Sequence, residues 1–307
     1  MVRLSATIAG LESRAKGETM KYLAIVLSVA LYSLSSLSGL GCSGNSDSDY
    51  VDDMAREHAD DSPESNEASE ASPAVDVDTE MVDYATINGE TATGYLARPA
   101  GVEGPLPGII VIHEWWGLND NVRSMAEQLA GEGYQALAVD LYGGESADTR
   151  DGASALMSAS MENAEALTEN VTQAFAYLEG DGQKVGTIGW CFGGGWSLAT
   201  ALALPEDVDA TVIYYGRLVT DQDELAPLRM PILGFFGAED QGIPVDSVHA
   251  FEESLNALGK DAAIHIYEGA NHAFANPSGT AYQAEPAKDA WEKTLAFFEA
   301  HLKSSSS

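Results

Sequence analysis

TIGWCFGGGWSLATAL, from Thr187 to Leu202, is the stretch of the chain that decides the fold. Its apolar first half predicts a strand that ends at Trp190, and its second half, rich in small residues, predicts a helix. Cys191 stands on the turn between them, where a side chain is displayed above a sheet as in a nucleophile elbow, with cysteine where serine is commoner. The alternative is that Cys191 is a small buried hydrophobic residue.

Composition sets broad limits on function. The chain has 307 residues, of which 45% are hydrophobic, so it can bury a substantial core. Its formal net charge is -33, with 15 lysines and arginines against 48 acids, which argues against a nucleic-acid partner. The two cysteines, Cys42 and Cys191, lie in different contexts and suggest no disulfide. Because no cysteines and histidines have zinc-site spacing, we expect no metal and no cofactor.

The N-terminal region, residues 1–41, reads as an over-extended start followed by a signal peptide. Met20 and Lys21 open a charged region, and the apolar stretch 22–34 is shorter than the roughly 20 residues that span a bilayer. Cys42 follows Ser-Gly-Leu-Gly, which resembles the lipobox of bacterial lipoproteins. We therefore expect Cys42 to be lipidated and the protein to be anchored in the bacterial cell envelope, at the outer membrane or periplasmic face; ordinary secretion is the alternative.

The rest of the chain divides by composition. Residues 42–80 begin with the predicted lipidation site, Cys42. From residue 43 they are rich in Ser, Asp, Glu and Ala, so we expect a disordered acidic tether that buries too little apolar surface to fold. Residues 81–303 are expected to form one catalytic domain, and 304–307 a polar tail. The only contact expected with a membrane is the lipid, and a monomer is favoured.

Strand and helix patterns alternate through residues 81–303, which predicts a single α/β domain with a doubly wound, mostly parallel sheet flanked by helices. Together with the nucleophile-elbow context of Cys191, this indicates the α/β-hydrolase fold. Asn88-Gly89 predicts the turn of a leading hairpin. Ligands of such sheets bind beyond the carboxyl ends of the strands. The expected strands are 83–87, 91–96, 108–113, 134–139, 184–190, 210–215, 231–236 and 262–267, and the expected helical regions are 119–131, 151–178, 245–258 and 287–301.

A cysteine nucleophile needs a base, and the base needs an orienting acid. In this fold the chain order is nucleophile, acid, histidine. Asp240 follows an expected strand and is the natural acid, although Asp beside Gly and Pro is also ordinary turn chemistry and Glu239 is a neighbouring alternative. His272 also follows a strand and is the candidate base. The remaining histidines are scattered or lie within expected strands and helices.

Several motifs together resemble the dienelactone hydrolase family, over nearly all of residues 84–302. The resemblance implies a Cys-Asp-His triad of Cys191, Asp240 and His272 that cleaves a lactone or carboxylic ester, a small-molecule substrate. The matching motifs are HEWWGLN at 113–119, DLY at 140–142, GWCFGG at 189–194, DQGIP at 240–244 and HAF at 272–274.

Position in the fold and the same resemblance assign further roles. The backbone amides of Phe192 and Trp115 are expected to donate to the oxyanion. Glu114 matches a family glutamate that interacts with the resting thiol, although it could also be an ordinary charged residue at a strand end. Trp115, Trp116 and Tyr142 are expected to line the pocket, although core packing could also explain them.

The chain departs from the family at its carboxylate-binding arginines. One is replaced by Gly143-Gly144 and the other by Asn276, which we place in the substrate pocket. An arginine fork is hard to replace for carboxylate recognition, although Arg150 or Arg217 could substitute from nearby loops. The departure favours a broad carboxylesterase or deacylase acting on neutral esters. A non-catalytic cell-surface binding lipoprotein is the alternative of another class.

Overall fold

The computed structural model describes residues 46–303, except 60, 65, 67, 70 and 181. At its centre lies an eight-stranded sheet in the order β1-β2-β4-β3-β5-β6-β7-β8. Strand β1 pairs antiparallel with β2, and β2 pairs antiparallel with β4. The six strands β4, β3, β5, β6, β7 and β8 run parallel to one another. The strands are β1 Val77–Ile87, β2 Glu90–Pro99, β3 Gly108–Ile112, β4 Gln135–Val139, β5 Val185–Trp190, β6 Ala210–Tyr214, β7 Ile232–Gly237 and β8 Ala262–Tyr267.

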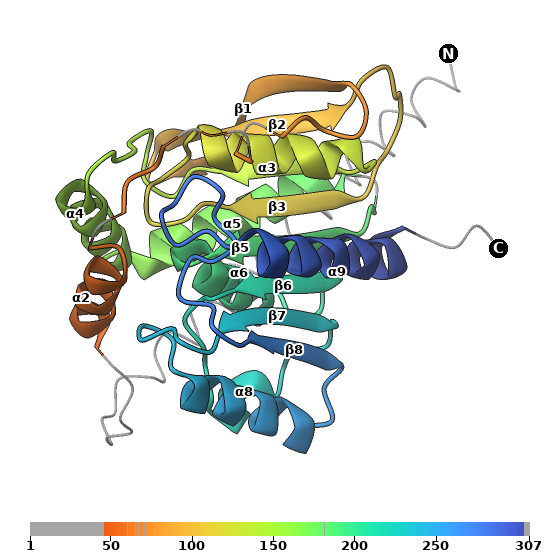
Figure 1. Cartoon of the computed structure of the whole chain (residues 1–307). Helices are drawn as coiled ribbons and strands as arrows, with labels where there is room; N and C mark the ends of the chain where they lie inside the picture. Colours follow the sequence, from red (N-terminus) through yellow and green to blue (C-terminus); the bar gives the residue numbers. More distant parts are fainter. Residues whose placement is uncertain are drawn as a thin grey trace, which may run out of the picture. The chain divides into compact units, whose positions relative to one another are not determined.

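The predicted α/β-hydrolase architecture is confirmed. Asn88 and Gly89, with φ of 53° and 87°, form the predicted hairpin turn between β1 and β2. Helices cover the sheet on both sides, with α3 and α9 on one face and α5 and α6 on the other (Figure 1). The helices are α2 Asp47–Glu57, α3 Asp120–Gly131, α4 Arg150–Met161, α5 Ala164–Glu179, α6 Phe192–Ala203, α7 Gln222–Leu225, α8 Val245–Ala257 and α9 Ala284–Leu302.

Glycines allow β5 and α6 to cross at very short range. A Cβ at Gly189 would lie 2.0 Å from the carbonyl oxygen of Gly193, and one at Gly193 would lie 2.3 Å from the carbonyl oxygen of Ile112. Real Cβ atoms do not approach backbone so closely, so both positions require glycine. The crossing sets the height at which Cys191, between these glycines, stands above the carboxyl edge of the sheet.

The segment before β1 differs from the prediction. A disordered tether over residues 42–80 is wrong for 47–57, which form α2, and for 77–80, which already belong to β1. Ser46 caps α2 in a capping box with Asp49, and Tyr50, Val51 and Met54 are buried. The average composition of the segment is acidic, but these apolar residues lie on one helical face, because positions separated by three or four residues are neighbours.

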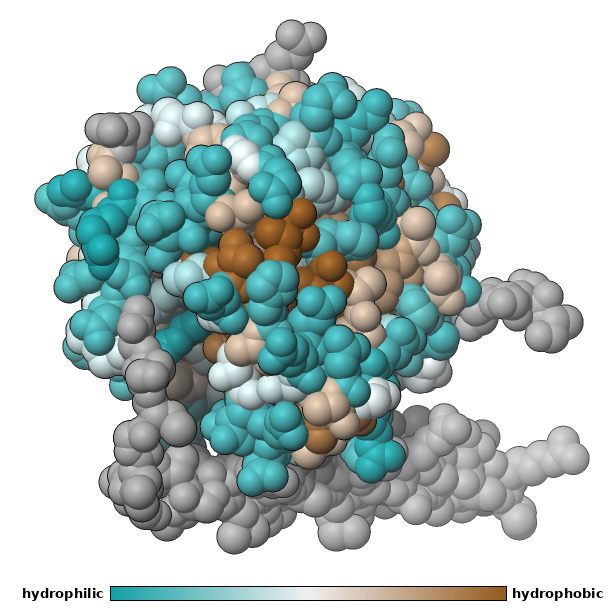
Figure 2. Space-filling view, turned by 60° about the horizontal axis from the view of Figure 1, so that its bottom comes forward, coloured by the Kyte–Doolittle hydropathy of each residue, from teal (hydrophilic) through white to brown (hydrophobic). Residues whose placement is uncertain are grey.

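Several predictions concern residues that the structure does not describe. The signal peptide, the alternative start at Met20, the lipidation site Cys42 and the tail 304–307 lie outside the described residues. Within the described part of the chain, no helix is both long and apolar enough to cross a bilayer. One face of the molecule is mostly hydrophilic, with its most hydrophobic residues gathered in a limited central area (Figure 2). This hydrophilic face agrees with the acid excess of the sequence.

The β5–α6 crossing can be tested with two neighbouring glycines. We expect Gly193→Ala to lower the free energy of unfolding by about 3 kcal/mol or more, because the new methyl group meets backbone that cannot move aside. Gly195→Ala is the control, since its Cβ meets Arg217 at an ordinary 3.4 Å and alanine favours helix by up to about 1 kcal/mol. Urea unfolding measures both, and equal stability of the two variants would contradict the crossing.

Candidate active site

Cys191 occupies the strained turn that the sequence predicted. Its φ is 55° and its ψ is -117°, directly between β5 and α6. The Cys191 amide donates to the Tyr214 carbonyl at 3.0 Å, which extends the pairing of β5 with β6. Tyr215 and Ala273 also have positive φ, and they lie in the loops that surround the cysteine. Such strain in non-glycine residues costs about 1–3 kcal/mol each and often marks functional sites.

His272 and Asp240 meet in the loops that follow β8 and β7. The Nδ1 of His272 lies 2.8 Å from Oδ2 of Asp240, and both side chains are buried. The other oxygen of Asp240 accepts the amides of Gly242 and Ile243 at 2.9 and 2.8 Å. These bonds fix the carboxylate, which in turn orients the imidazole. Among the described residues, Nε2 of His272 is buried with no hydrogen-bond partner.

The thiol and the imidazole of His272 lie close together. Sγ of Cys191 and ring nitrogens of His272 and His58 are all within 4.8 Å of one another. Burial alone would raise the pKa of the Cys191 thiol, but the imidazoles of His272 and His58 outweigh it and lower that pKa to about 6. Burial likewise opposes charge on His272, but the Asp240 carboxylate and the Cys191 thiolate hold its pKa well above the usual range. The environment therefore favours thiolate and imidazolium.

His58, which follows α2, is the residue that sequence reasoning missed. Its Nε2 lies 3.8 Å from Sγ of Cys191, and its Nδ1 lies 2.9 Å from Oδ2 of Asp61. The imidazole stacks on Trp115 with ring centroids 4.6 Å apart. Burial opposes the charged form, but the Asp61 carboxylate and the Cys191 thiolate raise the pKa of His58 to about 9. Two imidazole–carboxylate pairs thus flank one sulfur.

The segment that carries His58 covers the thiol. Sδ of Met54 lies 3.6 Å from Sγ of Cys191, and Cys191 is fully buried. A Cβ at Gly242 would lie 2.3 Å from the methyl group of Met54, so a glycine makes room for the methionine. Asp61 accepts the Thr280 amide at 2.8 Å, which ties the segment to the loop after His272. The segment, which also contacts α4, is the cover of the site in this structure (Figure 1).

Arg217 holds the other end of α2. Its guanidinium pairs with Asp47 at 2.5 Å and lies over the ring of Tyr50, 5.2 Å from its centroid. Arg150, the other arginine considered as a substitute, pairs with Asp151 on the surface of α4. Both arginines therefore have carboxylate partners within the chain.

Glu114 is held in place by two neighbours. Its carboxylate accepts from the hydroxyl of Tyr215 at 3.3 Å and from the amide of Asn276. Asn276 is 2% exposed, and its side-chain oxygen accepts from Ser278 and Asn121. Burial and the Cys191 thiolate raise the pKa of Glu114 to about 8. Asn276 thus positions Glu114 in this structure.

The remaining predicted residues gather around the turn. Trp115 and Trp116 are fully buried, with ring centroids 4.9 Å apart, and Tyr142 packs on Phe192 at 5.4 Å. Phe192 opens α6, so its amide has no acceptor within the helix. His113 accepts the Leu141 amide at Nε2 and bonds the Glu114 carbonyl at Nδ1, a structural role. The oxyanion and pocket roles stay predictions.

Gly143 and Gly144 have a structural reason to be glycine. Their φ values are 65° and 92°, a region that side chains other than glycine rarely adopt. The carboxylate of Asp140 accepts the amides of Tyr142 and Gly144, which closes this tight turn. An arginine at either glycine would require a different backbone.

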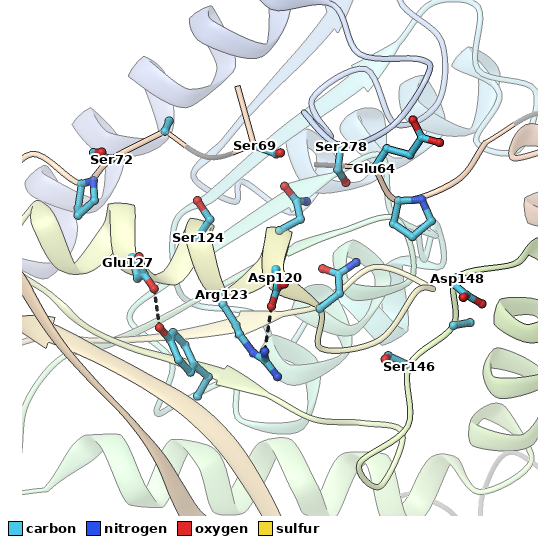
Figure 3. Close-up of a pocket in the computed structure, with 17 residues that line it drawn as sticks. Glu64, Ser69, Ser72, Asp120, Arg123, Ser124, Glu127, Ser146, Asp148 and Ser278 are labelled. Atoms are coloured by element: carbon cyan, nitrogen blue, oxygen red, sulfur yellow. Dashed lines mark hydrogen bonds and ion pairs between the residues drawn. The ribbon is translucent and has the colours of Figure 1, made fainter. Parts of the chain in front are cut away.

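A polar groove of about 850 Å³ lies between α3 and the segment before β1 (Figure 3). Three of its charged side chains have partners: Arg123 pairs with Asp120 at 2.9 Å, and Glu127 accepts from Tyr95. Cys191, Asp240 and His272 do not line it. The groove therefore lacks the reactive groups of the cysteine site.

A mostly parallel sheet with a cysteine on the turn between its fifth strand and the next helix defines an enzyme of the α/β-hydrolase class. Residues 92–302 match the dienelactone hydrolase family, and the chain belongs to that family. It is therefore a carboxylic-ester hydrolase.

Relatives support this assignment. Protein usf of Aquifex pyrophilus is 33% identical over 232 residues, which cover 73% of this chain and 99% of that protein. An Aquifex aeolicus protein named "Putative carboxymethylenebutenolidase" is 31% identical over 73% of this chain and 99% of its own length. The crystal structure of a "Putative Dienelactone Hydrolase" from Klebsiella pneumoniae superposes with a TM-score of 0.66 at 29% identity, covering 74% of this chain and all of that one.

The cover over Cys191 can be tested by alkylation. We expect Met54→Ala to raise the rate at which iodoacetamide labels Cys191 by about tenfold or more, because the shorter side chain uncovers the sulfur and weakens the packing of α2 by about 2–5 kcal/mol. Mass spectrometry of peptides separates Cys191 from Cys42. Met81→Ala is the control, since Met81 is 52% exposed on β1. Equal labelling of both variants would contradict the cover.

Proposed function

We propose that Cys191, His272 and Asp240 form a catalytic triad that hydrolyses a lactone or carboxylic ester. The observation that carries the proposal is their convergence at the carboxyl edge of the sheet, with Sγ of Cys191 and a nitrogen of His272 within 4.8 Å and Asp240 2.8 Å from the other side of that imidazole. The unpartnered Nε2 of His272 supports the role of base, since it is free to exchange a proton with substrate.

In the first half of the reaction the Cys191 thiolate attacks the carbonyl carbon and forms a C–S bond. The oxygen of the tetrahedral intermediate accepts from the amides of Phe192 and Trp115. When the C–O bond breaks, the departing alkoxide takes the proton from Nε2 of His272. The products of this half are an acyl-cysteine thioester and a neutral imidazole; with a lactone, the alcohol stays attached to the acyl chain.

In the second half His272 works as a base. Neutral Nε2 takes a proton from water, and the hydroxide attacks the thioester carbon. The C–S bond breaks, so the acid leaves and the thiolate–imidazolium pair is restored. Asp240 keeps the proton-bearing Nδ1 in place and stabilises the imidazolium in both halves.

Glu114 modulates the thiolate in this proposal. Because its pKa is raised to about 8, the carboxyl is mostly protonated at neutral pH and adds no full negative charge beside the sulfur. Asn276 and Tyr215 hold it in that place. A neutral Glu114 leaves the imidazoles as the dominant electrostatic influence on Cys191.

Substrate must displace the cover, since Met54 and His58 contact the sulfur that would attack. Lids that open for substrate and close over the reaction are common in hydrolytic enzymes. In this proposal the segment of α2 and His58 withdraws when substrate enters. The ion pair of Arg217 with Asp47, at the N-terminal end of α2, either breaks in this movement or stays intact as the point about which the segment turns.

The triad can be tested by substitution. We expect Cys191→Ala and Asp240→Asn to lower kcat for p-nitrophenyl acetate by about 10³-fold or more, because the first removes the nucleophile and the second removes the charge that orients His272. Activity is measured by nitrophenolate release. His249→Ala is the control, since His249 is exposed on α8 with Glu252 as its neighbour. Full turnover by Cys191→Ala would contradict the triad.

The missing arginines predict substrate preference. With Gly143, Gly144 and Asn276 at the family's arginine positions, no guanidinium there stabilises a substrate carboxylate. We expect kcat/KM for a neutral ester to exceed that for the matched ester with a free carboxylate by about tenfold or more, since a charge-assisted hydrogen bond contributes about 1.5–3 kcal/mol. A preference for the anionic ester would instead implicate Arg217, and Arg217→Gln would then remove it.

A further inference from the structure

Four donor atoms of soft or borderline character converge in the buried centre of the site. They are Sγ of Cys191, Nε2 of His58, a ring nitrogen of His272 and Sδ of Met54. Cys191 and Met54 are 0% exposed, His58 1% and His272 2%. In hydrolysis by the triad, Sγ of Cys191 attacks and His272 transfers the proton, whereas the thioether of Met54 has no role and His58 acts on the thiolate only through its charge.

The distances suit a shared metal ion. Sγ lies 3.8 Å from Nε2 of His58 and 3.6 Å from Sδ of Met54. A tetrahedral ion with metal–sulfur bonds of about 2.3 Å and metal–nitrogen bonds of about 2.0 Å separates a sulfur from a nitrogen by about 3.5 Å and two sulfurs by about 3.8 Å. These two separations match the tetrahedral values within a few tenths of an ångström, and the ligand atoms of Cys191, His58 and His272 all lie within 4.8 Å of one another.

The surroundings of the histidines are also those of metal ligands. A ligating histidine typically donates its other N–H to a carboxylate, which fixes the tautomer and raises the basicity of the ligand. Nδ1 of His58 pairs with Asp61 at 2.9 Å, and Nδ1 of His272 pairs with Asp240 at 2.8 Å. Nε2 of His58 therefore faces Sγ of Cys191. In His272, whose Nδ1 is paired with Asp240, Nε2 is the nitrogen left to bind an ion, and it has no hydrogen-bond partner within the described residues.

We propose that Met54, His58, Cys191 and His272 form a binding site for one thiophilic transition-metal ion, Zn²⁺ or Cu⁺. Thiolate and thioether ligands favour Cu⁺ and thiolate with imidazole also suits Zn²⁺, whereas Mg²⁺ and Ca²⁺ prefer oxygen. Cys191 binds as the thiolate and each imidazole binds through an unprotonated Nε2, so a bound ion displaces the Nε2 protons of His58 and His272, with any thiol proton, to solvent.

The site has a consequence for the cover. Two ligands come from the segment of α2 and His58, and two come from the loops at the carboxyl edge of the sheet. A bound ion therefore fastens the cover to the body of the enzyme and occupies the electron pair of the sulfur. Metal binding does not depend on the proposed hydrolysis. If Cys191 is the nucleophile, however, the bound ion inhibits ester hydrolysis.

The test is titration of the full chain in a Cys42→Ser background, in which Cys191 is the one remaining cysteine. Zn²⁺, Cu⁺ under reducing conditions, and Mg²⁺ are titrated separately by calorimetry or with a competing chelator, and Co²⁺ serves as the probe of thiolate charge-transfer absorption. We expect one equivalent of Zn²⁺ or Cu⁺, no binding of Mg²⁺, and a cobalt–thiolate band that Cys191→Ser abolishes.

Variants then test each part of the cluster. We expect His58→Gln and Asp61→Asn each to weaken binding of the bound ion by about 10- to 100-fold, because one loses a ligand and the other loses the group that orients it. Met54→Leu keeps the volume and lowers Cu⁺ affinity more than Zn²⁺ affinity. His249→Gln, on the exposed histidine of α8, leaves both affinities unchanged. Circular dichroism verifies that each variant is folded.

Two results would overturn the proposal. One is no near-stoichiometric binding of Zn²⁺ or Cu⁺ by the folded chain. The other is binding that His58→Gln leaves intact, since the ion would then be held by Cys191 and His272 alone. Failure of the hydrolase proposal gives a different pattern, in which the chain binds metal as expected but Cys191→Ala retains ester turnover.

Discussion

The backbone crossing of β5 and α6 determines where every reactive group can lie. Gly189 and Gly193 bring strand and helix so close that no Cβ fits between them. Cys191, between these glycines, must then adopt its positive φ and stand above the sheet edge. Because parallel strands end at the same edge, the loops after β7 and β8 bring Asp240 and His272 to the same place.

Burial of a thiolate imposes a second constraint. An isolated ion in a dry interior is very unfavourable, so a buried thiolate needs charged or hydrogen-bonding partners. His272 supplies one, and His58 supplies another from a segment more than a hundred residues earlier in the chain. Each imidazole in turn has its own carboxylate, Asp240 or Asp61. The cover is therefore electrostatically part of the site and more than a steric plug.

Sequence patterns predicted the parts of this arrangement that depend on local order. The alternation of strands and helices fixed the fold class, and the positions after strands pointed to Cys191, Asp240 and His272. They missed His58 because an acidic composition averaged over residues 42–80 hides the stripe of Tyr50, Val51 and Met54. A search for apolar residues at helical spacing, followed by a histidine four residues after Met54, could have found it. The packing of α2 on the rest of the protein depends on residues far away in the sequence, such as Gly242 and Arg217. The sequence pattern of the helix itself does not contain this information.

Asn276, which we expect to replace an arginine of the family, lies beside Glu114 and so bears on the electrostatics of the sulfur. A guanidinium at this position would add a positive charge beside Glu114 and favour its ionised form, whereas the neutral amide holds the carboxyl in place without charge. Raised by burial, the pKa of Glu114 then stays near 8, and the thiolate experiences little repulsion from it. In the proposed function, an asparagine in place of the arginine removes a grip on anionic substrates and leaves the thiolate to its two imidazole partners. Under that proposal, substrate preference and the state of the nucleophile are coupled through one buried side chain.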